Sequence, residues 1–190
     1  MQFRALVDDL LDAYFGHYPV HATEIGNHDH DGAWPDLTAA GGEARLAWLT
    51  HAIGSLQSLD EGALSRDERI DRRILLQNLE ALEFGERTLD EESWNPLTYV
   101  YLFGNGLFSL LAREFAPVDV RLRSAAERLR GLPAALDQAR ARLNAGGARQ
   151  ISQFHAQKAV ERMPGLTDLA DTAVEESSAV DDALRAEVAA

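Results

Sequence analysis

Cysteine and long apolar runs are both missing from this chain of 190 residues. Without cysteine the chain forms no disulfide and offers neither a thiol nucleophile nor thiolate ligands for zinc. No stretch reaches the roughly 18 consecutive apolar residues of a transmembrane helix. The first helical turns already carry Asp8 and Asp9, which is atypical of a secretory signal. We therefore expect a cytoplasmic protein that does not associate with membranes.

Positive charge is also scarce. The chain has 18 Lys and Arg against 31 Asp and Glu, which gives a formal net charge of −13. A chain this acidic gains little from contact with a phosphate backbone or an anionic lipid surface. Residues 121–149 are locally basic, but no aromatic side chains are interleaved among their arginines. We therefore expect no nucleic-acid partner.

Hydrophobic periodicity indicates helices almost throughout the chain, because apolar residues recur at spacings of three and four. Ser65 and Glu68 have the spacing of a capping box, and Pro133 suits the first turn of a helix. The sequence predicts an all-α bundle of roughly seven to nine helices. It forms a single domain, residues 1–190, in which residues 148–190 could form an appendage. The expected helices cover residues 3–14, 20–25, 38–59, 66–89, 107–115, 117–130, 133–146, 151–163 and 166–188.

Glycine and proline mark the expected breaks between several of these helices. Gly104, Asn105 and Gly106 in succession predict a break before residue 107. Pro164 and Gly165 predict another break. The run 97–102 is β-like and rich in aromatic residues, and it is also compatible with a buried loop or helix. We expect one irregular, aromatic-rich connection there.

Familiar catalytic and cofactor motifs are missing. The chain has no glycine-rich phosphate loop, no dinucleotide-binding fingerprint and no nucleophile elbow. His17 and His21 have the spacing of the histidines in a zinc-binding His-Glu-x-x-His helix. However, Tyr18 stands where glutamate is required, and Pro19 interrupts the turn. We therefore do not expect this pair to bind a metal.

The segment from Pro19 to Leu37 concentrates histidines and acidic residues. Neutral imidazole and carboxylate both suit zinc, so His28 and His30 are candidate ligands together with neighbouring aspartates such as Asp31. Asn and Asp in such segments also cap helix ends and bond to loop backbone. Structural capping is the preferred interpretation. A contribution to a neighbouring active site and an autonomous metal site stay open as alternatives.

Other polar and aromatic residues have structural interpretations first. Glu80, Glu83 and Glu86 recur at three-residue intervals and are interpreted as solvated surface, because a catalytic carboxylate needs burial or a partner. Arg113 is interpreted as a buried ion-pair anchor, with a clamp for a substrate carboxylate as the alternative. Tyr99 and the tryptophans are interpreted as core and loop anchors.

An ordered set of short motifs runs along nearly the whole chain. It comprises Pro19-x-x-Ala22-Thr23-x-x-Gly26-x-His28-x-x-Asp31, Pro35-Asp36-Leu37, Asp71, Asn95-Pro96-Leu97-x-Tyr99, Gly106-Leu107-Phe108-x-Leu110-Leu111-Ala112-Arg113-x-Phe115-Ala116-Pro117, Leu132-Pro133-x-x-Leu136-x-x-Ala139 and Ala159-Val160-Glu161-x-Met163-Pro164-Gly165-Leu166. Each piece is weakly specific, but the ordered set resembles the N-terminal portion of the bacterial domain of unknown function 885 family.

The resemblance implies a mostly helical fold that belongs to a longer architecture. Full-length members resemble gluzincin-type zinc metallopeptidases, with a His-Glu-x-x-His helix and a downstream glutamate ligand in their later part. This chain contains no such motif. The resemblance therefore implies a non-catalytic N-terminal portion that helps to form a substrate cleft. Zinc is implied only for the missing catalytic part, and no cofactor for this chain. The candidate cleft residues are His28, Asp31, Tyr99 and Arg113.

Two hypotheses from different classes follow. In the first, the chain is the N-terminal portion of a zinc metallopeptidase, is inactive alone, and pairs with the missing C-terminal part or with itself around a peptide. It predicts an exposed apolar patch. In the second, the chain is a stand-alone helical interaction module that binds a peptide or partner helix in a groove. It predicts a closed, polar exterior. A self-contained metal enzyme that uses His28 and Asp31 is a third, weaker alternative.

Overall fold

A computed structural model describes residues 3–146, 149–178, 180 and 182–188. Within these residues the protein consists of eight α-helices and has no β-strand, which confirms the all-α prediction. The helices are α1 (Phe3–His17), α2 (Pro19–Ile25), α3 (Ala39–Gln57), α4 (Arg66–Phe84), α5 (Pro96–Leu111), α6 (Val118–Ala145), α7 (Gln153–Ser178) and α8 (Asp182–Val188). No helix among the described residues has the length and apolar character needed to cross a membrane.

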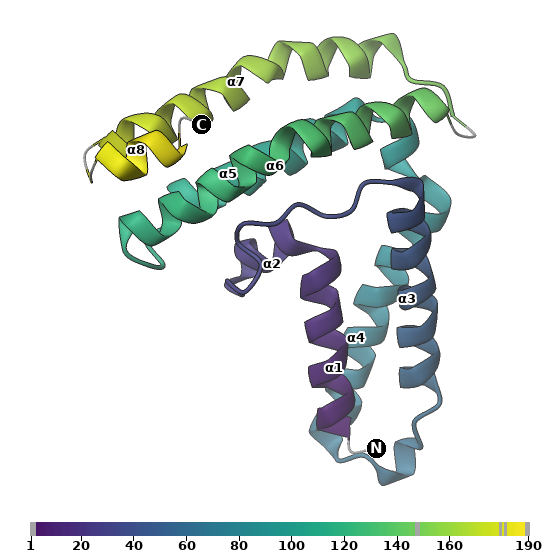
Figure 1. Ribbon diagram of the computed structural model, residues 1–190. Coiled ribbons are helices and arrows are strands. Elements are labelled where there is room, and N and C mark those ends of the chain that lie inside the picture. The colour runs from purple at the N-terminus through teal and green to yellow at the C-terminus, as the bar shows by residue number, and fades with distance from the viewer. Residues whose placement is uncertain (1–2, 147–148, 179, 181, 189–190) are drawn as a thin grey trace.

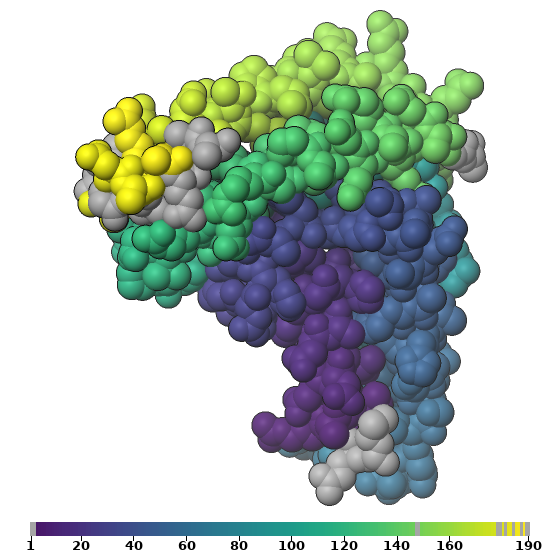
Figure 2. All heavy atoms as spheres, in the orientation of Figure 1, coloured from purple at the N-terminus to yellow at the C-terminus, as the bar shows by residue number. Residues whose placement is uncertain are grey.

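The helices form two limbs that meet at an angle (Figure 1). Helices α1, α3 and α4 lie side by side in one limb, here called the three-helix limb. Helices α5 to α8 form the second, here called the four-helix limb. Short helix α2 and the segment that follows it occupy the corner between them, and Figure 2 shows their side chains filling this corner.

The first half of the chain follows its local signals closely. Helix α2 begins at Pro19 and ends at Gly26, whose φ of 96° is the left-handed conformation that glycine adopts without strain. The Thr38 side chain accepts a hydrogen bond from the Gly41 backbone nitrogen and caps α3. Ser65 and Glu68 form both hydrogen bonds of the predicted capping box at the start of α4.

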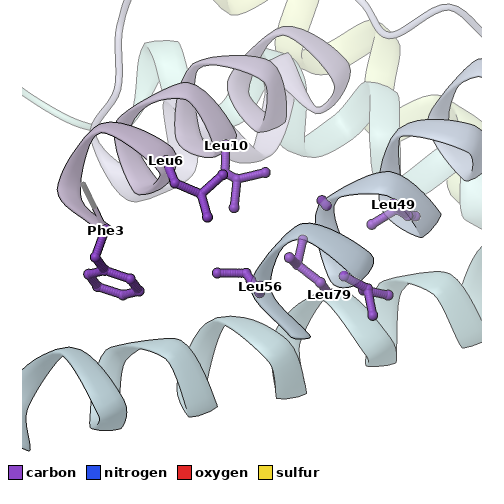
Figure 3. Packing of buried hydrophobic residues seen from close by; sticks show 8 residues of the cluster. Phe3, Leu6, Leu10, Leu49, Leu56 and Leu79 are labelled. Carbon is purple, nitrogen blue, oxygen red and sulfur yellow. The ribbon is translucent and has the colours of Figure 1, made fainter. Parts of the chain in front are cut away.

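Apolar side chains hold the three-helix limb together. Phe3, Leu6 and Leu10 of α1 point toward Leu49 and Leu56 of α3, with Leu79 of α4 beside them (Figure 3). Two further clusters fill the four-helix limb. One joins α5, α6, α7 and α8, and the other packs α5 and α6 around Leu37 from the corner segment. Each limb thus has its own core, and the corner segment adds a side chain to the second limb.

The expected break at Gly104–Gly106 is wrong, because α5 runs through it without interruption. The glycines allow close packing instead. A Cβ at Gly106 would lie 2.6 Å from Cη2 of Trp34, and a Cβ at Gly131 of α6 would lie 3.2 Å from Cδ1 of the same ring. The two glycines therefore form a notch between α5 and α6 that receives Trp34 from the corner segment.

The expected irregular connection at residues 97–102 is also wrong, since these residues form the first turns of α5. The irregular stretch lies just before them. A single π-helical turn, Gly85–Leu89, is followed by a short 3₁₀ turn, Glu91–Ser93, and Asp90 between them has a φ of 42°. Aspartate tolerates this left-handed conformation better than most residues. The Tyr99 side chain, counted as part of the connection, is buried in the core of the four-helix limb.

Two proline breaks that the sequence predicts do not occur. Pro133 lies inside α6 and Pro164 lies inside α7. Proline removes the hydrogen bond to the carbonyl four residues earlier. The carbonyl that loses its donor at Pro133 is that of Leu129; the neighbouring Arg128 carbonyl accepts a hydrogen bond from Trp34 Nε1 at 2.8 Å, which packs this part of α6 against the corner segment. Around Pro164, α7 packs along α5, where a Cβ at Gly104 would lie 3.4 Å from the Leu166 side chain. Both helices are thus packed against other elements where their prolines lie.

The C-terminal boundaries differ from the expectation in one further respect. Helix α6 ends at Ala145 with Gly146 at its C-cap, and Gly147, expected to close this helix, lies outside the described residues. The single helix expected over 166–188 is divided, because α7 ends at Ser178 and α8 begins at Asp182. Residues 179 and 181 lie outside the described part of the chain. The treatment of residues 148–190 as an appendage stays a prediction.

Candidate functional site

The histidine-rich segment forms a network of side-chain contacts. His28 Nδ1 lies 3.0 Å from Asp31 Oδ2, and the imidazole stacks on the Phe115 ring with centroids 3.7 Å apart. Asp31 is buried, and its Oδ1 accepts a hydrogen bond from Thr23 Oγ1 at 2.7 Å. These contacts tie the loop after α2 to α2 itself and to the segment between α5 and α6. They agree with a structural role for His28 and Asp31, whose part in a cleft stays a prediction.

Arg128 of α6 lies beneath this network and is completely buried. Its guanidinium donates hydrogen bonds to Thr23 Oγ1 at 2.8 Å, to the Gly106 carbonyl and to the Ala33 carbonyl at 3.3 Å. Burial lowers the pKa of Arg128 to about 10, and the nearby Asp31 carboxylate opposes this shift. The side chain is therefore still charged at neutral pH, and it ties α2, α5, α6 and the corner segment together.

The other sequence candidates lie in separate surroundings. Tyr99 is buried, donates a hydrogen bond to the Glu92 carbonyl at 2.7 Å, and packs near Phe103. Burial raises its pKa above the ordinary value, and the nearby Glu92 carboxylate adds to this rise. Arg113 is exposed and donates to the Glu24 carbonyl in the last turn of α2. The structure thus brings His28 and Asp31 together. It places Arg113 beside the last turn of α2 and Tyr99 in the core of the four-helix limb.

The donor groups do not fit a zinc ion. Within the described residues, no three or more His, Asp or Glu side chains converge in a way that could hold a metal, and the chain has no cysteine. His28 has Asp31 beside it but no third ligand, and His30 does not complete the set. Three protein ligands are the usual minimum for a catalytic zinc site. A metal site built on His28 and His30 therefore has no geometric support.

A mostly apolar pocket with several polar and charged residues in its lining opens where the two limbs meet, and we call it the junction pocket. Its volume is about 270 Å³, and its walls come from the end of α1, from α2, α3 and α5, and from the connection before α5. Pockets with a few convergent polar groups are the usual sites of small-ligand binding. The lining residues are Tyr18, Val20, His21, Glu24, Pro35, Arg45, Glu92, Thr98, Tyr101, Leu102 and Asn105.

Arg45 and Glu92 belong to the lining of this pocket, and Glu86, which does not, pairs with Arg45. The guanidinium of Arg45 is buried, with Nε 2.9 Å from Glu86 Oε1 and Nη2 2.7 Å from both Glu92 oxygens. Its Nη1 donates to the Asp36 carbonyl, and Tyr18 Oη donates to Glu86 Oε1 at 3.1 Å. Every nitrogen of Arg45 therefore has a protein partner. The group is a structural cation and not a free clamp for a substrate anion.

The pKa values of Glu92, Arg45 and Tyr18 are shifted by burial and by nearby carboxylates. Burial raises the pKa of Glu92, and Arg45 opposes the rise. Burial alone would lower the pKa of Arg45, but the Glu92 and Glu86 carboxylates raise it above its ordinary value. Burial and Glu86 also raise the pKa of Tyr18. Two carboxylates, those of Glu24 and Glu92, and one guanidinium, that of Arg45, belong to the lining of the pocket. The lining therefore carries a net negative charge, which suits a positively charged ligand group.

A group of the opposite charge lies against one lining residue. The guanidinium carbon of Arg162, from α7, lies 5.3 Å from the centroid of the Tyr101 ring. Tyr101 is 48% exposed, and Asn105 beside it is also exposed. A ligand with an ammonium group and a nearby carbonyl or carboxylate would meet the acids of the lining and, next to Tyr101, the Arg162 cation. A peptide with a free N-terminus has this combination of groups.

Sequence reasoning missed the residues that matter most here. Glu86 was interpreted as solvated surface together with Glu80 and Glu83, yet it pairs with buried Arg45. Neither Arg45 nor Arg128 was singled out. A usable signal existed for Arg45, which lies on the apolar face of its helix one residue before Leu46 and four before the buried Leu49. A charged residue on an apolar face is buried only with a partner.

Comparisons with known proteins are consistent with this fold. The family model "Bacterial protein of unknown function (DUF885)" matches residues 19–190. A solved structure from Shewanella oneidensis, described as "a putative lipoprotein of unknown function", superposes with a TM-score of 0.82 at 24% identity. The match covers all of this chain and 34% of that one. No curated protein matches. The chain therefore belongs to the DUF885 family of bacterial proteins of unknown function.

Proposed function

We propose that this chain is the non-catalytic N-terminal helical part of a zinc-dependent metallopeptidase and that the junction pocket is its share of the substrate cleft. The observation that carries the proposal is the lining of the pocket, where Glu24 and Glu92 border a space of about 270 Å³ and the lining residue Tyr101 contacts the Arg162 guanidinium. Groups of this charge pattern suit the amino end of a peptide. Residues outside this chain would supply the zinc ligands.

Two open apolar faces favour this proposal over a stand-alone interaction module. The groove between α1 and α4 has a volume of about 450 Å³, and the groove between α5, α6 and α7 about 480 Å³. Large apolar side chains near the second groove are exposed, including Phe154 at 63% and Val160 at 70%. A stand-alone module is expected to have a closed, polar exterior, whereas part of a larger architecture leaves such faces open. A cytoplasmic location is part of the proposal.

Zinc binding by the purified 190-residue chain tests the non-catalytic part of the proposal. We expect calorimetric titration with zinc to show no stoichiometric binding, and peptide hydrolysis to be absent with and without the metal. The physical reason is that the described side chains provide no third ligand beside His28 and Asp31. The His28→Ala variant should behave identically. Tight binding of one zinc ion that is lost in His28→Ala would overturn the proposal.

Peptide binding tests the junction pocket. We expect the chain to bind a tetra-alanine peptide that carries a fluorescent label at its C-terminus, measured by fluorescence anisotropy at low ionic strength. Glu24→Gln removes one of the carboxylates and should weaken binding about tenfold, close to the value of one charge-assisted hydrogen bond. N-acetylation of the peptide should have a similar effect, because it removes the ammonium charge.

The matched control is Glu175→Gln, which removes the same charge from an exposed position on α7. It should leave the affinity unchanged. Equal binding of the free and acetylated peptides, or equal losses in the two variants, would contradict a specific ammonium site in the pocket.

A further inference from the structure

The outer face of α4 carries a regular, mostly apolar stripe of exposed side chains. Ile70, Ile74, Gln77, Ala81 and Phe84 recur at spacings of four, three, four and three, and we call this stripe the outer seam. Ile70 is 37% exposed, Ile74 49% and Phe84 54%, and the other two are also exposed. The opposite face of α4 supplies the side chains that pack into the three-helix core.

This spacing is the heptad pattern of a coiled-coil seam. With Ile74 and Ala81 at the a positions, Ile70, Gln77 and Phe84 occupy the d positions. The seam borders the apolar groove between α1 and α4, which Ala81 also lines together with exposed Leu11.

Charged residues beside the seam would pair between two antiparallel copies of α4. On the side of the seam that precedes Ile74 and Ala81 in sequence, α4 carries Arg73 and, one heptad later, Glu80. The first half of the helix as a whole has both signs of charge, with Asp67, Glu68 and Asp71 among its arginines. Arg73 and Glu80 both occupy g positions, are exposed, and make no hydrogen bond or ion pair among the described residues. In an antiparallel helix pair the g positions of the two helices face each other. Two copies of α4 would therefore place Arg73 of each beside Glu80 of the other.

We propose that the outer seam of α4 is a self-association surface, through which two copies of this chain form an antiparallel, two-fold symmetric dimer. A single seam that pairs with itself satisfies the requirement of an isologous interface, in which the same patch is used on both subunits. The two reciprocal Arg–Glu pairs select the antiparallel orientation, since a parallel pair would leave Arg73 beside Asn78. This inference is independent of the proposed peptidase role, and none of the seam residues lines the junction pocket.

Sedimentation equilibrium and light scattering on the full chain test the proposal over a concentration range of about 1 to 500 μM, because a single helix pair gives an interface at the small end of the specific range. We expect a reversible monomer–dimer equilibrium. Ile74→Asp should raise the dissociation constant at least tenfold, and Val160→Asp on exposed α7 should not change it. Circular dichroism establishes that both variants keep their helical content.

Exchanging the two charges distinguishes specific pairing of Arg73 with Glu80 from nonspecific hydrophobic association. Arg73→Glu alone places like charges together and should weaken the dimer at low salt, whereas Arg73→Glu combined with Glu80→Arg should restore it. A chain that stays monomeric over the whole range would overturn the proposal, as would a dimer that Ile74→Asp leaves intact. Failure of the double variant to restore the dimer would overturn the antiparallel pairing. None of these outcomes depends on peptide or zinc binding.

Discussion

Replacing Arg128 by methionine is expected to lower the free energy of unfolding by about 3 to 5 kcal/mol, the range found when one partner of a buried polar cluster is removed. The guanidinium is the donor for the carbonyls of Gly106 and Ala33 and for the hydroxyl of Thr23. Methionine fills much of the volume but donates no hydrogen bond. The buried Gly106 carbonyl and Thr23 hydroxyl then lose a partner, and leaving such buried groups unsatisfied costs more than the bonds themselves contribute.

Urea denaturation followed by circular dichroism measures this effect. The matched control is Arg140→Met on the same helix, because Arg140 pairs only with Asp137 and both side chains are more than two-thirds exposed. Surface pairs of this kind contribute little, so the control should change the free energy of unfolding by less than about 0.5 kcal/mol. Similar losses in both variants would show that Arg128 is not the structural tie that joins α2, α5, α6 and the corner segment.

Gly106→Ala is expected to destabilise the protein by about 2 to 3 kcal/mol, although alanine is the better helix former. A methyl group at this position would lie 2.6 Å from Cη2 of Trp34. The ring cannot move aside freely, because Nε1 donates to the Arg128 carbonyl and the ring packs edge-on against Phe103 at 5.1 Å. Extra methyl groups in such a tightly packed region force neighbouring side chains or backbone to shift.

The opposite sign is expected at Gly54 in α3, where an added Cβ meets nothing within 4 Å. Gly54→Ala should stabilise the protein by about 0.5 to 1 kcal/mol through helix propensity alone. In a Trp34→Phe background the smaller ring should make Gly106→Ala less costly, by about 1 kcal/mol or more, because residues in contact are not additive. Equal changes in the free energy of unfolding for Gly106→Ala and Gly54→Ala would falsify the close packing of Trp34 in the notch between α5 and α6.

Local features of the sequence were sufficient to predict the first half of the fold. The amphipathic face of α1, the Gly26 stop after α2 and the capping box at Ser65 are all formed as predicted. Each depends on residues within about one or two helical turns of one another, so no tertiary information is needed. The all-α class follows from the same periodicity repeated along the chain.

The candidate site was predictable only in small part. The contact between His28 and Asp31 spans three residues, and the motif around them indicated a structured segment. By contrast, Arg45 is 41 residues from Glu86 and 47 from Glu92, and Arg128 is 105 residues from Thr23. Whether such an arginine is solvated or buried depends on which distant partners the fold places beside it. No local pattern contains that information.

The sequence by itself determined where apolar helix faces form and which helices are capped, because those properties depend on short-range spacing and hydrogen bonding. Only the tertiary structure decided that α5, α6 and α7 continue through their glycines and prolines. A glycine considered alone predicts a helix break, yet Gly106 is the position in α5 against which Trp34 packs. The energy of that contact comes from a ring 72 positions away along the chain, and it outweighs the local preference for a turn.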